Sequence, residues 1–217
     1  MGMELIQMEL GILQANCYII GDPKTKEAVI IDPGYPDKEL LDWLQNEEWK
    51  IRGIWLTHGH FDHIGAVPFL KDQLGVQVRV HSLENEYLEN PELNLSASYS
   101  STELSFSGDH QMEDGDTVSM GNHIFHVIHV PGHTTGSVCY YEPKEKVLFS
   151  GDVLFRGSIG RTDLPKGSLS DLMNHIKEKL LVLPEDTVVY PGHGPATTIE
   201  EEKKSNSYLS DQWYETN

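Results

Sequence analysis

Apolar residues along this chain fall into short runs with two spacings, one typical of strands and one typical of helices. Runs rich in valine, isoleucine and aromatic residues predict strands over 15–21, 27–34, 51–58, 76–82, 117–121, 123–132, 136–143, 146–152 and 187–194. Apolar positions three and four apart predict helices over 37–47, 66–75, 169–183 and 198–213. Because strands and helices alternate, the pattern predicts an α/β layered fold.

Residues 84–115 interrupt this alternation. They are polar and rich in serine, asparagine and glutamate, with little periodicity after one or two turns of possible helix. A segment of this length inside a compact domain is usually functional or mobile. The chain otherwise shows no linker, low-complexity tract or short repeat, so the sequence predicts a single domain over 1–217.

Composition and charge restrict the possible partners. The 217 residues are 38% hydrophobic, which is sufficient for a substantial core. The formal net charge of -18 repels phosphate backbones and anionic membranes, so neither nucleic acid nor a membrane is expected as a partner. The N-terminus lacks the pattern of a signal peptide, and no window reaches the roughly 18 apolar residues of a spanning helix. A cytoplasmic location is therefore expected, and the oligomeric state is left open.

The short stretch HGHFDH brings four metal-ligand types together directly after a predicted strand: His58, His60, Asp62 and His63. Imidazole and carboxylate groups bind zinc and similar ions. Residues two apart in extended backbone face the same side, so His58 and His60 are expected to point at one site. Asp62 and His63 follow the turn into a helix and can face a second point. The stretch therefore has enough ligands to serve two neighbouring ions.

Three more ligand-type residues stand at the ends of later predicted strands, each beside a glycine. They are His133 in PGHTTGS, Asp152 in SGD and His193 in PGHG. Because α/β folds collect their sites at strand ends, these residues are predicted to complete the metal site. The remaining histidines are expected to be structural or simply exposed: His81, His110, His123, His126, His129 and His175.

In this order, THGHFDH, PGHTTGS, SGD and PGHG resemble the metallo-β-lactamase superfamily, over nearly the whole chain. The resemblance implies a four-layer αββα sandwich of two mixed β-sheets flanked by helices, with the metals at one edge of the sheets. It implies two divalent metal ions, with zinc expected and iron or manganese as alternatives. It also implies the ligands: His58, His60 and His133 for the first ion, Asp62, His63 and His193 for the second, and Asp152 bridging both.

The stretch GDVLFRGSIGRTDLPKGS resembles the glyoxalase II branch, the hydroxyacylglutathione hydrolases, and especially its short bacterial members. Those enzymes carry in this loop a basic residue after a glycine that contacts glutathione, a pattern that Gly160 and Arg161 match. Asp163 stands where an aromatic residue is expected, and the chain ends at Asn217, where longer members continue into a helical domain. The resemblance thus implies a thioester hydrolase with Arg161 as a substrate-binding residue and leaves the thiol carrier open.

The implied reaction uses a hydroxide held between the two metals to attack a thioester carbonyl. Asp62 binds its metal and holds the proton of the nucleophile, which makes it the expected catalytic residue. One alternative is a persulfide dioxygenase with a single iron on a subset of the same ligands. Another is hydrolysis of a different ester, a lactone, a phosphodiester or a β-lactam, and a third is a binding module that only stores metal.

Overall fold

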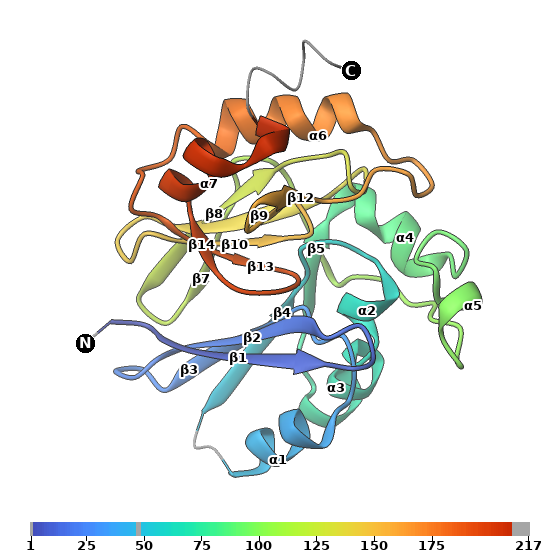
Figure 1. Ribbon diagram of the computed structural model, residues 1–217. Coiled ribbons are helices and arrows are strands. Elements are labelled where there is room, and N and C mark those ends of the chain that lie inside the picture. Colours follow the sequence, from blue (N-terminus) through green and yellow to red (C-terminus); the bar gives the residue numbers. More distant parts are fainter. Residues whose placement is uncertain (1, 47–48, 210–217) are drawn as a thin grey trace.

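Two six-stranded sheets lie face to face, and helices cover the outer face of each (Figure 1). The computed structural model describes residues 2–46 and 49–209. The first sheet has the order β1-β2-β3-β4-β5-β6: β1 (Glu4–Leu10), β2 (Ala15–Asp22), β3 (Glu27–Ile31), β4 (Lys50–Trp55), β5 (Val78–His81) and β6 (His110–Met112). Its first two pairings are antiparallel and the other three parallel, so the sheet is mixed.

The second sheet has the order β14-β13-β10-β9-β8-β7 and is also mixed, because β10 and β13 are parallel while its other pairs are antiparallel. Its strands are β7 (Thr117–Met120), β8 (His123–His129), β9 (Val138–Glu142), β10 (Val147–Gly151), β13 (Val188–Pro191) and β14 (Thr197–Thr198). A separate hairpin pairs β11 (Leu154–Phe155) with β12 (Ser158–Ile159).

Helices fall into two groups according to the sheet that they cover. Next to the first sheet are α1 (Lys38–Asn46), α2 (Phe61–Ile64) and α3 (Val67–Leu74). Next to the second are α6 (Leu169–His175), its wider continuation η2 (Ile176–Leu180) and α7 (Ile199–Ser205). The remaining short helices are η1 (Ser82–Glu84), α4 (Asn85–Glu89), α5 (Ser96–Tyr99) and η3 (Ser207–Leu209).

Strand β2 shows how the layers are held together. Cys17 and Ile19 point to the core under the helices of the first sheet, while Tyr18 and Ile20 point between the two sheets. This alternation is the period of two expected for a strand buried on both faces. A third apolar cluster lies between the second sheet and its helices. Three cores therefore separate four layers, which confirms the predicted αββα sandwich.

All strands and helices predicted from the sequence are present, with shifts of a few residues at their ends. The helix predicted over 198–213 is shorter: α7 ends at Ser205, and Asn206 leaves helical backbone geometry with ψ of 110° while its side-chain amide donates to the carbonyl of Ser158. Residue 47 and residues 210–213 of the predicted helices lie outside the described residues. The elements not predicted are short or lie at sheet edges: β1, β6, β11, β12, β14, η1, α2 and α5.

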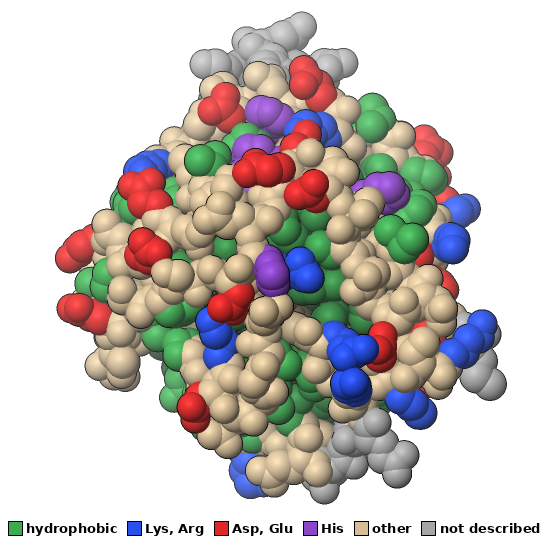
Figure 2. All heavy atoms as spheres, turned by 180° about the vertical axis from the view of Figure 1, so that it is seen from behind, with side chains coloured by type: hydrophobic (Ala, Val, Ile, Leu, Met, Phe, Trp, Pro, Cys, Tyr) green, Lys and Arg blue, Asp and Glu red, His purple; other side chains and the backbone are tan. Residues whose placement is uncertain are grey.

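None of the helices in the described ranges has the length and apolarity needed to cross a bilayer. Figure 2 shows the face opposite to that in Figure 1, where lysine and arginine side chains are scattered among acidic ones. Positive charge is therefore dispersed over that face.

Candidate metal centre

The seven ligand-type residues predicted from the sequence meet where the carboxyl ends of β4, β8, β10 and β13 approach one another. The loop after β4 and the short helix α2 supply four of them, and the segment that follows each of the other three strands supplies one. All are at least partly buried: His58, His60, Asp62, His63, His133, Asp152 and His193.

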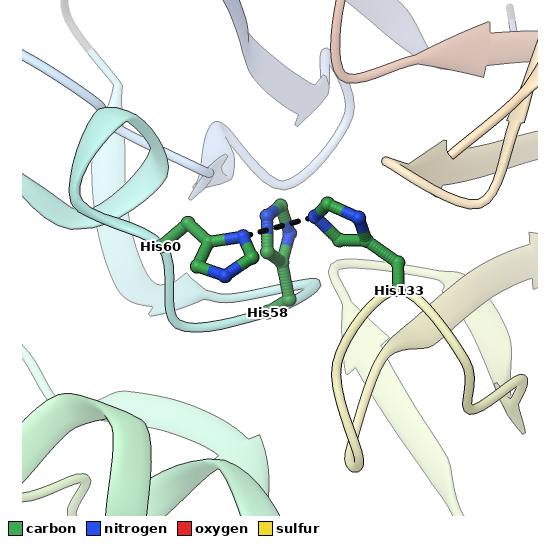
Figure 3. A group of neighbouring side chains, drawn as sticks. All are labelled: His58, His60 and His133. Atoms are coloured by element: carbon green, nitrogen blue, oxygen red, sulfur yellow. Dashed lines mark hydrogen bonds between the residues drawn. The ribbon is translucent and has the colours of Figure 1, made fainter. Parts of the chain in front are cut away.

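His58, His60 and His133 form a first group, in which one ligand atom of each lies within 4.8 Å of the others. Nδ1 of His60 lies 2.9 Å from Nε2 of His133 (Figure 3). All three side chains are at most 3% exposed. A buried group of three imidazoles is the donor set that suits zinc, iron and similar ions.

Asp62, His63 and His193 form a second group of the same size. Nε2 of His193 lies 3.2 Å from Oδ2 of Asp62 and 3.4 Å from Nε2 of His63. The structure therefore brings together the two sets of three that the family resemblance implies.

Asp152 lies between the two groups and faces both. Its Oδ1 is 3.4 Å from Nε2 of His63, and its Oδ2 is 3.6 Å from Nε2 of His133. The turn that carries His193 packs closely on this carboxylate, because a Cβ at Gly192 would lie 2.1 Å from Oδ1 of Asp152. Glycine at 192 therefore permits the approach of the two loops.

Three buried polar atoms of this cluster have no hydrogen-bond partner in the described part of the chain: Nε2 of His58, Nε2 of His60 and Oδ1 of Asp152. Buried polar atoms are almost always paired, so three unpaired ones in one cluster require an explanation. Burial lowers the pKa of His60 to about 3 and that of His58 well below its usual value, which leaves neutral imidazoles. Metal binding needs neutral imidazoles, so these residues fit divalent ions.

Asp32 orients one ligand of the second group. Its Oδ2 accepts a hydrogen bond from the hydroxyl of Thr57 and lies 3.1 Å from Nδ1 of His63, and its Oδ1 accepts from the backbone N–H of Thr57. A carboxylate behind a ligand histidine fixes the ring and its tautomer. Asp32 was not predicted from the sequence, although it stands at the end of an apolar strand just as Asp152 does.

Glu84 joins the two loops that carry His60 and His133. It is fully buried, and its two carboxylate oxygens accept hydrogen bonds of 2.7 Å from the backbone N–H groups of Gly59 and Gly136. Burial raises the pKa of Glu84 to about 7. Its place in the polar segment 84–115 gave no signal of this role in the sequence.

The first sheet holds the turn that carries His193. The side-chain amide of Asn16 donates to the carbonyls of Pro191 and Gly194, and the hydroxyl of Tyr18 also donates to Pro191. Strand β2 thereby fixes a loop that lies far away in sequence. Neither Asn16 nor Tyr18 was identified from the sequence, because only the contact between sheets gives them this role.

Arg161 reaches the centre through its backbone: its carbonyl oxygen lies 2.8 Å from Nδ1 of His133. Its guanidinium group donates two hydrogen bonds, of 2.7 and 2.8 Å, to the carboxylate of Asp163. Both side chains are more than half exposed. The expected contact of the Arg161 side chain with substrate stays a prediction, and the pair with Asp163 limits the net charge that this side chain offers to an anion.

Comparison with known proteins gives the same family over most of the chain. A family profile of the metallo-beta-lactamase superfamily matches residues 10–193. The hydroxyacylglutathione hydrolase GloC of Haemophilus influenzae is 35% identical over 97% of this chain and 99% of its own length.

Two solved structures are similar in fold and in sequence. The BLEG-1 B3 metallo-beta-lactamase has a TM-score of 0.90 and 44% identity, covering 95% of this chain and 100% of its own. TTHA1623 in a di-iron-bound form has a TM-score of 0.85 and 38% identity, covering 94% of this chain and 100% of its own. The matched residues 10–193 contain both ligand groups, and the chain belongs to the metallo-beta-lactamase superfamily.

Proposed function

We propose that this protein is a hydrolase of thioesters of the S-(hydroxyacyl)glutathione type that works with two divalent metal ions. The observation that carries the proposal is the pair of three-residue groups on either side of Asp152, with three buried polar atoms left unpaired. The similarity to a hydroxyacylglutathione hydrolase over nearly the whole of both chains supports thioester chemistry.

The seven residues have distinct roles in this proposal. His58, His60 and His133 would hold one ion, Asp62, His63 and His193 would hold the other, and Asp152 would be available to both. Two bound divalent ions would polarise a carbonyl oxygen and lower the pKa of water. Asp62 holds the proton of the attacking water at a carboxylate oxygen and orients it towards the carbonyl carbon.

The cysteines of the chain do not offer a competing nucleophile. Cys17 and Cys139 are both fully buried, and burial raises the pKa of each thiol. A thiolate is the reactive form of cysteine, so neither side chain serves covalent catalysis near neutral pH. This favours direct attack by water over an acyl-enzyme on cysteine.

Zinc is the first candidate for the metal, with iron and manganese as alternatives. Imidazole and carboxylate ligands accept all three, and the similar TTHA1623 is described in a di-iron-bound form. A second candidate function is β-lactam hydrolysis, supported by the similarity to a B3 metallo-beta-lactamase. A mononuclear persulfide dioxygenase would use a subset of the same ligands, so metal content and oxygen uptake distinguish it from the two-metal hydrolase.

Metal analysis combined with a substrate panel tests the proposal. We expect about two ions per chain, loss of turnover with a chelator, and thiol release from S-D-lactoylglutathione without oxygen uptake. One iron per chain with oxygen uptake on a persulfide identifies the dioxygenase, and faster turnover of a cephalosporin identifies the lactamase. His60→Ala should lower the metal content, whereas His175→Ala, at a half-buried histidine on α6 outside the cluster, should leave it unchanged.

A further inference from the structure

A cleft of about 800 Å³ opens beside the metal centre and shares Asp62 with it. Its walls are the turn between β1 and β2, the segment before α1, the helices α2 and α3, and residues 99–104. Five of the ten large apolar side chains that are exposed among the described residues line it: Ile12, Leu13, Tyr35, Phe69 and Tyr99. A volume of this size accommodates a small organic group.

One wall of the cleft is held in place by the buried polar side chain of Asn94. Asn94 is fully buried, and its side-chain amide donates to the carbonyls of Tyr87 and Leu104. Its backbone carbonyl accepts from the N–H of Phe61, which ties the wall to the helix that carries Asp62. The ring of Tyr99 stacks on Phe61 with centroids 6.1 Å apart. The exposed ring of Tyr99 is therefore held in place at the cleft.

The opposite wall, formed by the turn between β1 and β2, keeps its apolar side chains exposed to the cleft. Gly11 has φ of 66°, and its N–H donates to Oδ2 of Asp37 at 2.9 Å. A Cβ at Gly11 would lie 3.1 Å from Cβ of Tyr35, so this left-handed glycine lets the turn approach that ring closely. The turn leaves Ile12 90% exposed at the mouth of the cleft.

The charged side chains that line the cleft disfavour an anion. Among its lining residues the charged ones are Asp37 and Asp62, and none of those described is lysine or arginine. The guanidinium group of Arg161 is bound to Asp163 and is not part of the lining. The lining therefore offers no positively charged side chain to a carboxylate, and the net charge of -18 adds to the repulsion away from the metal ligands.

We infer that this cleft binds an uncharged, apolar substituent of the thioester, a conclusion that rests on the proposed function. The substituent is either the acyl chain or the residue attached to the thiol sulfur. A thiol that carries carboxylates, such as glutathione, lies outside the cleft. Ile12, Tyr35, Phe69 and Tyr99 then determine specificity by removing the substituent from water.

Two thioester series distinguish the sources of the substituent. The first lengthens the acyl group from acetyl to hexanoyl on the neutral thiol N-acetylcysteamine. The second keeps acetyl and compares benzyl mercaptan with mercaptoacetate. In the series whose substituent enters the cleft, kcat/KM should rise by about fourfold for each buried CH₂ or its equivalent. Equal rates in both series, or preference for the mercaptoacetate ester, overturn the inference.

Substitutions in the cleft test whether it causes the preference for apolar thioesters. Ile12→Ser should lower kcat/KM for the preferred apolar ester by about fivefold. The loss is moderate because a side chain at the open mouth of the cleft contributes only part of the transfer free energy of a fully buried isoleucine. Val182→Ser, at a 70% exposed apolar residue outside the cleft, should have no effect. Equal kinetics of Ile12→Ser and wild type on that ester overturn the inference.

Binding of the neutral dye Nile red to the metal-free protein gives a readout that does not need activity. Dye affinity should fall in Ile12→Ser and in Tyr99→Ser and stay unchanged in Val182→Ser. If no thioester is hydrolysed but the dye result holds, the proposed function fails and the apolar site stands. If thioesters are hydrolysed but no variant changes dye affinity, the cleft assignment fails and the proposed function stands.

Discussion

The metal centre and the cleft share Asp62, yet their residue types restrict their function to very different degrees. In the centre, His58, His60 and His133 are at most 3% exposed, whereas the five exposed large apolar side chains of the cleft are 41–90% exposed. A buried imidazole or carboxylate requires a specific partner, so residue identity nearly determines the chemistry. An exposed apolar side chain can be exchanged for another of similar size, so the cleft sets which substituent is accepted and not which reaction occurs.

Asp62 belongs to both regions, and its substitution should have the largest effect on turnover. Asp62→Ala should lower kcat by on the order of 10²-fold or more, because it removes a ligand and the group that holds the proton. Unfolding by denaturant should change little, and Asp72→Ala, at an exposed carboxylate on α3, serves as the control. Near wild-type kcat with both metals bound would contradict the role of Asp62.

Asp32 contacts the centre only through other residues, so its effect should be smaller. Asp32→Asn replaces the acceptor next to Nδ1 of His63 and weakens the orientation of that ring. Loss of such a partner typically costs about 10–100-fold in metal affinity. Competition with a chelator measures the affinity, and the apolar cleft should retain its Nile red binding. An unchanged metal affinity would show that Thr57, not His63, is the functional partner of Asp32.

Glu84 tests whether the loops of the centre depend on a buried support. In Glu84→Gln one backbone N–H faces an amide NH₂ group in place of an acceptor, which should cost about 1–3 kcal/mol in the free energy of unfolding. Glu86→Gln, at an exposed carboxylate nearby, should change it by less than about 0.5 kcal/mol. Equal unfolding transitions for the two variants would remove Glu84 from the supporting structure.

The same variant has a pH dependence with a defined sign. Burial raises the pKa of Glu84 from 4.5 to about 7, so the folded protein holds this proton more tightly than the unfolded chain. Stability from this group is fully present below pH 4.5 and is lost as the pH rises to about 7. The difference in unfolding free energy between wild type and Glu84→Gln should therefore decrease over this interval. A difference that grows instead would contradict a raised pKa.

The contrast between the two regions also explains what the sequence could predict. Strand ends such as Asp152 and His193 combine a local pattern with a ligand-type side chain, and the fold brings such ends together. Glu84 and Asn94 satisfy backbone groups across loops, and Ile12 lines the cleft because a turn places it there, so no local pattern marks them. Strand β1 was missed because it lies at a sheet edge and only Met8 and Leu10 of its residues are buried, which weakens the apolar signal. The single domain, the cytoplasmic location and the small-molecule partner stay predictions.

Substitution of Arg161 should have the smallest effect, and it tests whether this side chain binds an anionic thiol directly. Its guanidinium group is already paired with Asp163, so the pair offers little net charge to an anion. We expect Arg161→Ala to change KM for S-D-lactoylglutathione by less than about twofold, because exposed ion pairs contribute little. Arg52→Ala, which breaks an exposed pair with Glu27 elsewhere, is the matched control. A rise in KM at constant kcat that shrinks with added salt would instead show direct binding of the anionic thiol by Arg161, because salt screens exposed charges beyond about 8–10 Å.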